Sequence, residues 1–339
     1  MQKDPFPKFK ALLKNAQHIV IVTHFNPDGD AMGSSLALYN YLVKTGKSVT
    51  VITPNDYPEF LHWLPGNKKV VEYSNYPKKA ATLVTKSDLI FTLDFNNYSR
   101  LEGLGELLKN STARKILIDH HQQPDTYATL MYHDVKAGST CELVYEFIVG
   151  LGGKKLIDKN IASCLYTGIM TDTGSFRFDS VTSATHVILA HLLETGVVPN
   201  DIHSAIYDTY SENRVRLLGY CLSEKMVVIP EMQTAYISLT EKELNRFQHK
   251  KGDTEGIVNY PFTIRGIKLC VFFSEGDGKI KISFRSKGSF DVNQLARKHF
   301  NGGGHINAAG GRGSSSDMDT TIKEFLSLLP SYKKEIMNT

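Results

Sequence analysis

Four short apolar segments in the first half of the chain are separated by segments of helical pattern, and this alternation constrains the fold most. The apolar segments lie at 18–24, 48–54, 87–94 and 114–121. Continuous β-branched runs that alternate with helices are typical of a parallel sheet covered on both faces. We therefore predict an α/β N-terminal domain, with a parallel sheet and helices on both of its faces.

The last third of the chain has a different pattern, in which short strand-like segments are separated by turns such as EGDGK. Helical segments at 291–299 and 317–328 follow these strands. The pattern predicts a smaller α+β C-terminal domain, and 339 residues suffice for two separate cores. We place the catalytic domain at 1–196, a helical linker at 197–224 and the second domain at 225–339.

The composition favours a small anionic substrate. The net charge of +4 is low for a protein that tracks long nucleic acid, although short nucleic acid stays compatible with it. The N-terminus lacks the apolar core of a signal peptide, and no apolar run could span a bilayer, so we expect a cytoplasmic protein without a membrane partner. Four separated cysteines fit reduced, buried thiols better than a zinc site: Cys141, Cys164, Cys221 and Cys270.

Metal-binding side chains stand where three of the predicted strands end. The strand ends and the loops after them carry seven such residues: His24, Asp28, Asp30, Asp94, Asp119, His120 and His121. One strand that stops at Asp or His is explained as well by its reaching solvent. Three neighbouring strands are harder to explain in that way, because the carboxyl ends of parallel strands meet at the edge where ligands bind.

Asp28 and Asp30 lie in the segment PDGDAMGSS, where Gly29 is expected to let the chain turn between the two carboxylates. Two such close negative charges repel each other unless a cation lies between them. We interpret them as ligands of different ions in a pair. The alternative is an Asp-rich turn that caps a helix beginning near Asp30.

Asp94 comes between the other candidates in the expected sheet, which makes it the natural bridging carboxylate, or else a turn residue in DFNN. Adjacent side chains on an extended segment diverge. One of His120 and His121 should therefore bind metal while the other faces substrate, unless both are a partly exposed pair. Asp172 adds a carboxylate in GIMTDTGSFRF, where an ordinary helix-end Asp is the alternative.

This donor set predicts the metal and the reaction. Oxygen and imidazole ligands without thiolate favour Mn²⁺, with Mg²⁺, Co²⁺ or Zn²⁺ as less favoured occupants. Two ions about 3.5–4 Å apart can clamp a phosphoryl group and lower the pKa of a water nucleophile. The sequence therefore predicts a two-metal site that hydrolyses phosphate esters.

The second domain contains a glycine-rich segment, FNGGGHINAAGGR, whose three glycines are expected to leave backbone N–H groups open to an anion. The nearby segment KISFRSKG adds a guanidinium and two hydroxyl groups that suit phosphate. The expected phosphate-binding residues are Ser283, Arg285, Ser286, Gly302, Gly303, Gly304 and His305.

Together these segments resemble the DHH phosphoesterase family, whose name describes Asp119-His120-His121. The order THFNPDGDAMGSS, LDF, IDHH, TDTGSFRF and GGGHINAAGG follows the family motifs over nearly the whole chain. The last element resembles the DHH-associated C-terminal domain. The chain length and short linker resemble the nanoRNase/pAp phosphatase branch.

The resemblance implies a role for each candidate. One ion would be held by His24, Asp28 and Asp94. The other would be held by Asp30, Asp94, His120 and Asp172. Asp119 would orient a histidine ligand, and His121 would face the scissile phosphate or the leaving group. The second domain would hold another phosphate of the nucleotide.

By the same resemblance, we expect a Mn²⁺-dependent phosphoesterase that degrades short oligoribonucleotides to mononucleotides and converts pAp to AMP. Cleavage of cyclic di-AMP or its linear product pApA is an alternative with the same chemistry. A non-catalytic nucleotide- or RNA-binding module is a second alternative, although it predicts lost metal ligands and none is lost. The expected partners are short RNA and pAp, and a homodimer is a further hypothesis.

Overall fold

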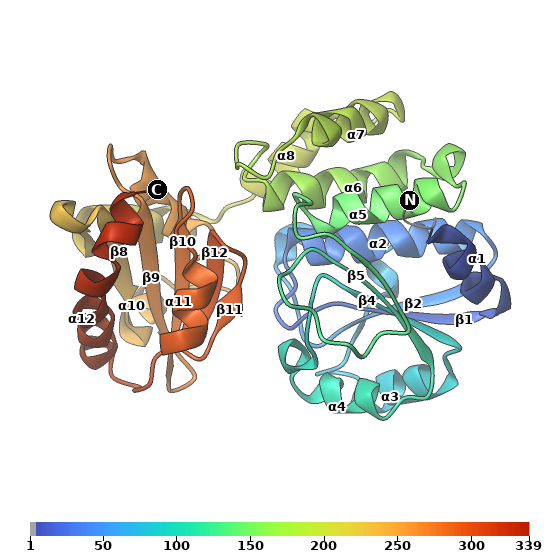
Figure 1. The fold of residues 1–339 in the computed structure, drawn as a ribbon, viewed down its shortest axis with the longest axis horizontal. Helices are drawn as coiled ribbons and strands as arrows, with labels where there is room; N and C mark the ends of the chain where they lie inside the picture. Colours follow the sequence, from blue (N-terminus) through green and yellow to red (C-terminus); the bar gives the residue numbers. More distant parts are fainter. Residues whose placement is uncertain (1–4, 339) are drawn as a thin grey trace. The chain divides into compact units, whose positions relative to one another are not determined.

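The structure, a computed structural model, describes residues 5–338 and divides into two compact units (Figure 1). The first unit ends at Thr209 and the second begins at Tyr210. This division falls inside the segment 197–224 that we predicted as a linker. That segment is interrupted, because it contributes α8 (Pro199–Tyr207) to the first unit and α9 (Glu212–Tyr220) to the second.

The first unit is built on a parallel sheet of six strands in the order β3-β2-β1-β4-β5-β6. The strands are β1 (His18–Val22), β2 (Ser48–Thr53), β3 (Val71–Glu72), β4 (Leu89–Leu93), β5 (Arg114–Asp119) and β6 (Leu130–His133). The strand order reverses between β1 and β4. In such sheets a ligand binds beyond the carboxyl ends of the two strands at the reversal.

Helices cover both faces of this sheet, which confirms the predicted α/β architecture (Figure 1). One face is covered by α1 (Phe6–Asn15), α2 (Gly29–Lys44), α5 (Thr140–Gly150) and α6 (Lys159–Asp172), and α7 (Ser183–Glu194) packs on α5 and α6. The opposite face is covered by α3 (Pro77–Lys86) and α4 (Gly103–Lys109). Side chains of β1 alternate between the two cores, with Ile19 and Ile21 on the first and Val20 and Val22 on the second.

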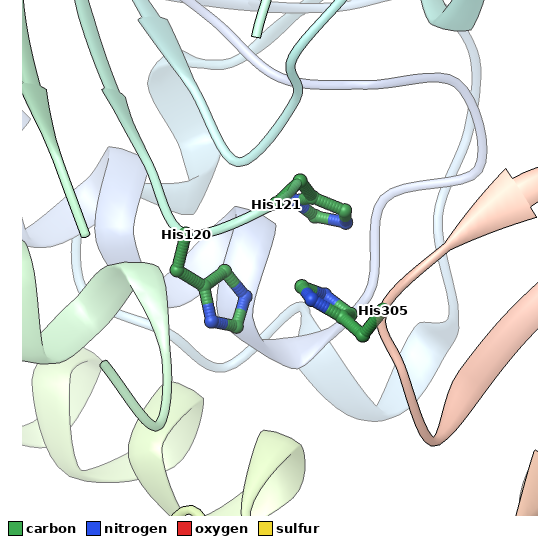
Figure 2. A group of neighbouring side chains, drawn as sticks. All are labelled: His120, His121 and His305. Atoms are coloured by element: carbon green, nitrogen blue, oxygen red, sulfur yellow. The ribbon is translucent and has the colours of Figure 1, made fainter. Parts of the chain in front are cut away.

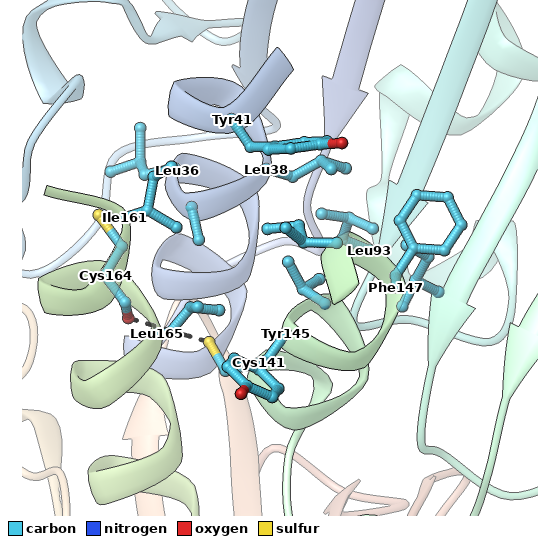
Figure 3. Close-up of a cluster of buried hydrophobic side chains, with 14 of the residues drawn as sticks. Leu36, Leu38, Tyr41, Leu93, Cys141, Tyr145, Phe147, Ile161, Cys164 and Leu165 are labelled. Carbon is cyan, nitrogen blue, oxygen red and sulfur yellow. Dashed lines mark hydrogen bonds between the residues drawn. The ribbon is translucent and has the colours of Figure 1, made fainter. Parts of the chain in front are cut away.

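Close packing of α2 against α6 explains Gly29, and here the sequence-based reason was wrong. Gly29 is the first residue of α2, and a Cβ atom there would lie 2.3 Å from the Thr171 hydroxyl of α6. The glycine is needed for that approach and not for a turn. Figure 3 shows the core beneath, where the buried Cys141 thiol lies 3.9 Å from the Cys164 carbonyl. As predicted, all four cysteines are buried and free.

The second unit contains a mixed sheet in the order β11-β12-β10-β9-β8-β7, in which β8 and β9 are parallel. Its strands are β7 (Met226–Ile229), β8 (Thr234–Leu239), β9 (Leu269–Gly276), β10 (Lys279–Ser286), β11 (Gly303–Gly304) and β12 (Ala308–Arg312). Its further helices are α10 (Glu241–Arg246), α11 (Val292–His299) and α12 (Met318–Met337). This confirms the predicted α+β second part of the chain.

Helix α12 is longer than the predicted segment 317–328, because it continues through Pro330 to Met337. Proline removes one helical hydrogen bond, but Leu329 and Ile336 on either side of it are buried against the sheet. Within residues 5–338, no helix combines the length and hydrophobicity that crossing a membrane requires. The cytoplasmic location stays a prediction.

Candidate functional site

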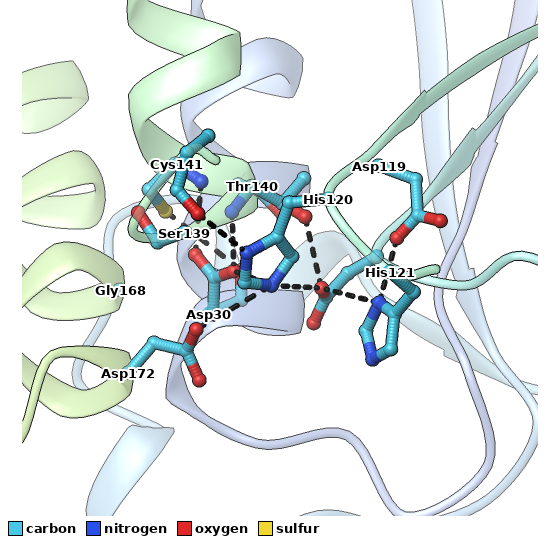
Figure 4. A network of polar contacts seen from close by, with 12 residues as sticks. Asp30, Asp119, His120, His121, Ser139, Thr140, Cys141, Gly168 and Asp172 are labelled. Atoms are coloured by element: carbon cyan, nitrogen blue, oxygen red, sulfur yellow. Dashed lines mark hydrogen bonds and ion pairs between the residues drawn. The ribbon is translucent and has the colours of Figure 1, made fainter. Parts of the chain in front are cut away.

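All the residues predicted to bind metal lie at the carboxyl edge of the first sheet, within two groups. His24, Asp28 and Asp94 form one group, in which one ligand atom from each lies within 4.8 Å of the others. The second group meets the same criterion (Figure 4) and consists of Asp30, His120 and Asp172. Residues that follow β1, β4 and β5 thus meet residues at the start of α2 and the end of α6, at the reversal of strand order.

Asp94 faces both groups. It follows β4 with a positive φ of 64°, a conformation that costs about 1–2 kcal/mol for most residues but is more common for Asp. One carboxylate oxygen lies 3.5 Å from Nε2 of His24, and the other lies 3.6 Å from Nε2 of His120. With only 2% of its surface exposed, Asp94 has the position of a bridging ligand.

The two histidines present their Nε2 atoms to carboxylates. Nδ1 of His24 lies 2.9 Å from the Phe25 carbonyl, and Nδ1 of His120 lies 3.0 Å from the Ala137 carbonyl. A carbonyl oxygen can only accept a hydrogen bond, so Nδ1 must carry the hydrogen in both rings. In the neutral ring, Nε2 then has a lone pair that is available to a metal ion.

The distance from His120 to Asp172 fits two ligands of one cation, whereas the distance to Asp30 is a few tenths of an ångström longer. Nε2 of His120 lies 3.4 Å from Asp172 and 3.8 Å from Asp30, which is longer than an ordinary hydrogen bond. Two ligands that each lie about 2.1 Å from one ion are roughly 3.0–3.4 Å apart for octahedral or tetrahedral angles. Such a set of carboxylates and lone pairs is mutually repulsive unless a proton or a metal ion lies among them.

The pKa values of the buried groups at this edge indicate an excess of negative charge. Burial, followed by the charges of Asp94 and Asp172, raises the pKa of Asp30 well above its ordinary value. Burial alone would lower the pKa of His120, but the charges of Asp94 and Asp30 outweigh it and raise that pKa. Burial opposes the ionisation of Asp94, yet the imidazoles of His24 and His121 hold its pKa below the usual range.

The N-terminus of α5 stabilises Asp30, which the sequence did not reveal. The backbone N–H groups of Thr140 and Cys141 donate to the two Asp30 oxygens at 2.6 and 2.9 Å (Figure 4). The Thr140 hydroxyl donates to Asp94 at 2.8 Å. A helix N-terminus favours negative charge, so α5 orients two carboxylates that belong to different ligand groups.

Asp119 contacts His121 and not the predicted metal ligand His120, which corrects one expectation. Nδ1 of His121 lies 2.7 Å from Asp119, and the rings of His120 and His121 are nearly perpendicular at 82° (Figure 2). The prediction that these adjacent side chains diverge is wrong, because their ring centroids lie only 5.2 Å apart. Burial, followed by the charge of Arg100, lowers the pKa of His121 well below its ordinary value.

Arg100 is a second residue that sequence reasoning missed. It lies in a 3₁₀ turn, Tyr98–Leu101, and its backbone carbonyl accepts a hydrogen bond of 2.7 Å from Phe25. Among the contacts of residues 5–338, its half-buried guanidinium makes no hydrogen bond or ion pair. The pKa values of His24 and Asp119 are both raised, and the positive charge of Arg100 opposes each rise.

The candidates on β10 face opposite sides of the strand. Ser283 and Arg285 are two residues apart and partly exposed, so they share one side. Ser286 lies on the buried side, where its hydroxyl donates to the Phe290 carbonyl at 2.6 Å and accepts from Asn307 at 3.0 Å. The expectation that Ser286 joins the other two on one phosphate is therefore wrong.

The glycine loop also differs from the expectation, because its N–H groups are engaged within the second unit. Gly302 donates to Ala296, Gly304 donates to the Asn293 side chain, and His305 donates to Ala308. The glycines instead allow close approach, since a Cβ atom at Gly302 would lie 2.0 Å from the Gly310 carbonyl. His305, also labelled in Figure 2, is half-buried on the loop between β11 and β12.

A parallel sheet that presents two groups of carboxylate and imidazole ligands at its strand-order reversal has the site of a metal-dependent phosphoesterase. The chain belongs to the DHH family. Residues 18–169 match the DHH family N-terminal domain, and residues 233–333 match the DHHA1 domain.

Two relatives are named as a bifunctional oligoribonuclease and PAP phosphatase, NrnA. The Bacillus subtilis protein is 30% identical over 320 residues, which cover 90% of this chain and 95% of the relative. The Thermus thermophilus protein is 32% identical over 311 residues, which cover 91% of this chain and 88% of the relative.

Two solved structures share the fold. The crystal structure of an exopolyphosphatase-related protein from Bacteroides fragilis has a TM-score of 0.92 and 42% identity, and the match covers 97% of this chain and 96% of that one. RecJ from Thermus thermophilus, solved in complex with Mn²⁺, has a TM-score of 0.55 and 14% identity. That match covers 97% of this chain and 54% of RecJ, and it supports the fold alone.

Proposed function

We propose that this chain is a Mn²⁺-dependent phosphoesterase that hydrolyses short oligoribonucleotides to mononucleotides and pAp to AMP. The observation that carries the proposal is the position of Asp94, whose two oxygens face the His24 group and the His120 group at 3.5 and 3.6 Å. The names of the two NrnA relatives supply the substrate class.

In this proposal, the two ligand groups hold two divalent ions that share Asp94. His24 and Asp28 complete one set, and Asp30, His120 and Asp172 complete the other. Bound ions of this kind polarise phosphoryl oxygens and lower the pKa of a nearby water. Carboxylate-rich ligand sets without thiolate suit Mn²⁺.

His121 would meet the substrate through Nε2, because Asp119 engages its Nδ1 atom at 2.7 Å. The lowered pKa keeps His121 neutral before substrate binds. An arriving phosphate would bring negative charge and raise that pKa, so Nε2 of His121 would take up a proton from water and then donate it to the leaving oxygen. The guanidinium of Arg100 would stabilise charge on the phosphoryl group.

In the second unit, we propose that Ser283, Arg285 and His305 hold another phosphate of the nucleotide. Ser283 and Arg285 share the partly exposed side of β10, and a guanidinium can bind two phosphate oxygens at once. Backbone N–H groups of Gly302 and Gly304 have no part in this proposal, because other residues of the unit accept their hydrogen bonds. The predicted phosphate-binding role of Gly303 stays part of this proposal.

The test is hydrolysis of a substrate panel by the purified protein. The panel contains RNAs from two to about twenty nucleotides, pAp, pApA and cyclic di-AMP, each with Mn²⁺, Mg²⁺, Co²⁺ or a chelator. We expect the highest rates on dinucleotides and pAp with Mn²⁺ and none with the chelator. Rates on long RNA that equal those on dinucleotides would refute the short-substrate proposal, and dominance of cyclic di-AMP would favour the alternative. Sedimentation of the same preparation tests the predicted homodimer.

A further inference from the structure

Glu142 is a buried carboxylate that none of the roles above uses. It lies in the first turn of α5 with 6% of its surface exposed. Its Oε2 atom accepts a hydrogen bond of 3.1 Å from the backbone N–H of Gly138. Its Oε1 atom is buried and has no hydrogen-bond partner among residues 5–338. A buried carboxylate with so few partners is costly, which calls for an explanation beyond packing.

The peptide group that Glu142 contacts is the one that contacts His120. The N–H of Gly138 and the C=O of Ala137 belong to the same amide, and that carbonyl lies 3.0 Å from Nδ1 of His120. A negative acceptor on the N–H of an amide increases the negative charge on its oxygen. The three groups therefore form one line of hydrogen bonds, from the carboxylate through the peptide to the imidazole.

We propose that Glu142 is a positioning residue for the ligand His120 and acts through the Ala137–Gly138 peptide. The polarised carbonyl holds the hydrogen of His120 on Nδ1 and increases electron density at Nε2, the atom that faces Asp30 and Asp172. Metal-binding histidines commonly donate their other N–H to a carboxylate or to a carbonyl. Here both kinds of partner occur in one line, because the Ala137 carbonyl contacts His120 and the N–H of the same amide donates to the Glu142 carboxylate. This inference rests on the proposed function, because that function gives His120 its metal.

Helix capping is the competing explanation, and the contacts argue against it. Ser139 is the N-cap of α5 and its hydroxyl already accepts from the N–H of Glu142 at 3.1 Å. In a capping box, the carboxylate at the position of Glu142 would return to the N–H of Ser139. It binds Gly138 instead. A Cβ atom at Gly138 would lie 2.9 Å from Oε1 of Glu142, so glycine permits this approach.

The experiment compares Glu142→Gln and Glu142→Ala with the matched control Glu146→Gln. Glutamine keeps the size and an acceptor for Gly138 but loses the charge that polarises the peptide. Glu146 lies one turn later on α5 and contacts the Tyr132 hydroxyl, outside the line to His120. Mn²⁺ affinity is measured by calorimetry, and the Nδ1–H signal of His120 is measured by ¹⁵N NMR in metal-free protein.

We expect Glu142→Gln to weaken Mn²⁺ binding about tenfold and Glu142→Ala up to about 100-fold, as for other partners of metal ligands. The His120 Nδ1–H signal should move or exchange faster in both variants and stay unchanged in Glu146→Gln. If Glu142→Ala does not fold, Glu142→Gln decides. Wild-type affinity together with an unchanged His120 signal in Glu142→Gln would overturn the positioning role.

The NMR measurement separates this inference from the proposed function. A wild-type protein that neither binds Mn²⁺ nor hydrolyses the substrate panel would refute the proposed function. If the His120 signal still depended on Glu142 in that case, the line of hydrogen bonds would stand. Conversely, the wild-type enzyme could be active while Glu142→Gln keeps the wild-type Mn²⁺ affinity and His120 signal. That result would refute only the line of hydrogen bonds from Glu142 to His120.

Discussion

The polar groups at the carboxyl edge of the first sheet differ from those in the glycine loop of the second unit in their distances to possible hydrogen-bond partners. At the sheet edge, Nε2 of His120 lies 3.4–3.8 Å from three carboxylates, too far for ordinary hydrogen bonds. In the loop, the N–H groups of Gly302, Gly304 and His305 all have acceptors within their own unit. Convergent charged groups at such spacings are typical of a site that binds a cation. A glycine-rich segment indicates no more than close packing until its hydrogen bonds are traced.

The strongest test of this contrast is Asp94→Asn at the sheet edge. Asparagine tolerates the left-handed backbone of Asp94 but removes the shared negative charge. We expect kcat to fall roughly 10³-fold or more, beyond the roughly 10–100-fold effect of a residue that only supports a ligand. Hydrolysis of a dinucleotide and far-UV circular dichroism would be measured together.

Asp125→Asn is the matched control, because Asp125 is an exposed carboxylate that accepts from Asn97 outside both ligand groups. It should retain nearly wild-type activity. If a folded Asp94→Asn variant had the same kcat as this control, the sheet edge would have no part in catalysis.

Arg100→Gln tests whether the cation beside this edge serves the substrate or the fold. We expect kcat to fall about 10–100-fold, because a guanidinium near developing phosphoryl charge contributes in the transition state. Mn²⁺ affinity should be unchanged or higher, since a positive charge near His24 is removed. Arg114→Gln, at the exposed amino end of β5, is the control. Parallel losses of Mn²⁺ affinity and kcat would contradict a substrate role.

Gly302→Ala tests the other side of the comparison. An added methyl group would meet the Gly310 carbonyl at 2.0 Å, so we expect a loss of about 1–3 kcal/mol in the free energy of unfolding. Urea denaturation measures this loss. Gly276→Ala is the control, since a Cβ atom there meets nothing within 4 Å, and it should change stability by less than about 0.5 kcal/mol. If Gly302→Ala left the stability unchanged but weakened substrate binding, the loop would again be a candidate anion site.

The smallest expected effect is a pH dependence of stability in metal-free protein. The pKa values of His24, Asp30 and His120 are raised by folding, so their stabilising contributions are present at low pH and decrease as pH rises through the folded values. The pKa of His121 is lowered, so its contribution is lost below its ordinary value of 6.5 and is complete above it.

Between pH 6.5 and about pH 8, the raised pKa values of His24, Asp30 and His120 therefore determine the direction in which stability changes. The melting temperature should decrease by a few degrees over this interval. Stabilisation by Mn²⁺ should increase over the same interval, because the ion replaces protons. Differential scanning fluorimetry with and without Mn²⁺ measures both trends. A metal-free melting temperature that rises over this interval would contradict the excess of negative charge at the sheet edge.

The sequence alone determined the parallel sheet and the set of candidate ligands at its edge. Apolar runs fix the strands, and the carboxyl ends of parallel strands must meet at one edge. His24 and His120 were therefore expected to converge on Asp94, and both lie within 3.6 Å of it. The sequence pattern did not predict β6 or the end of α12, where packing outweighs local pattern.

Tertiary structure alone decided how the ligands are held and which polar groups stay available. Thr140 donates to Asp30 across 110 residues of sequence, and Glu142 reaches His120 only through a peptide of the intervening loop. The inward side of Ser286 likewise became evident only once the register of β10 was known. Strand ends follow from local periodicity, whereas hydrogen bonds between distant segments depend on how helices and loops pack.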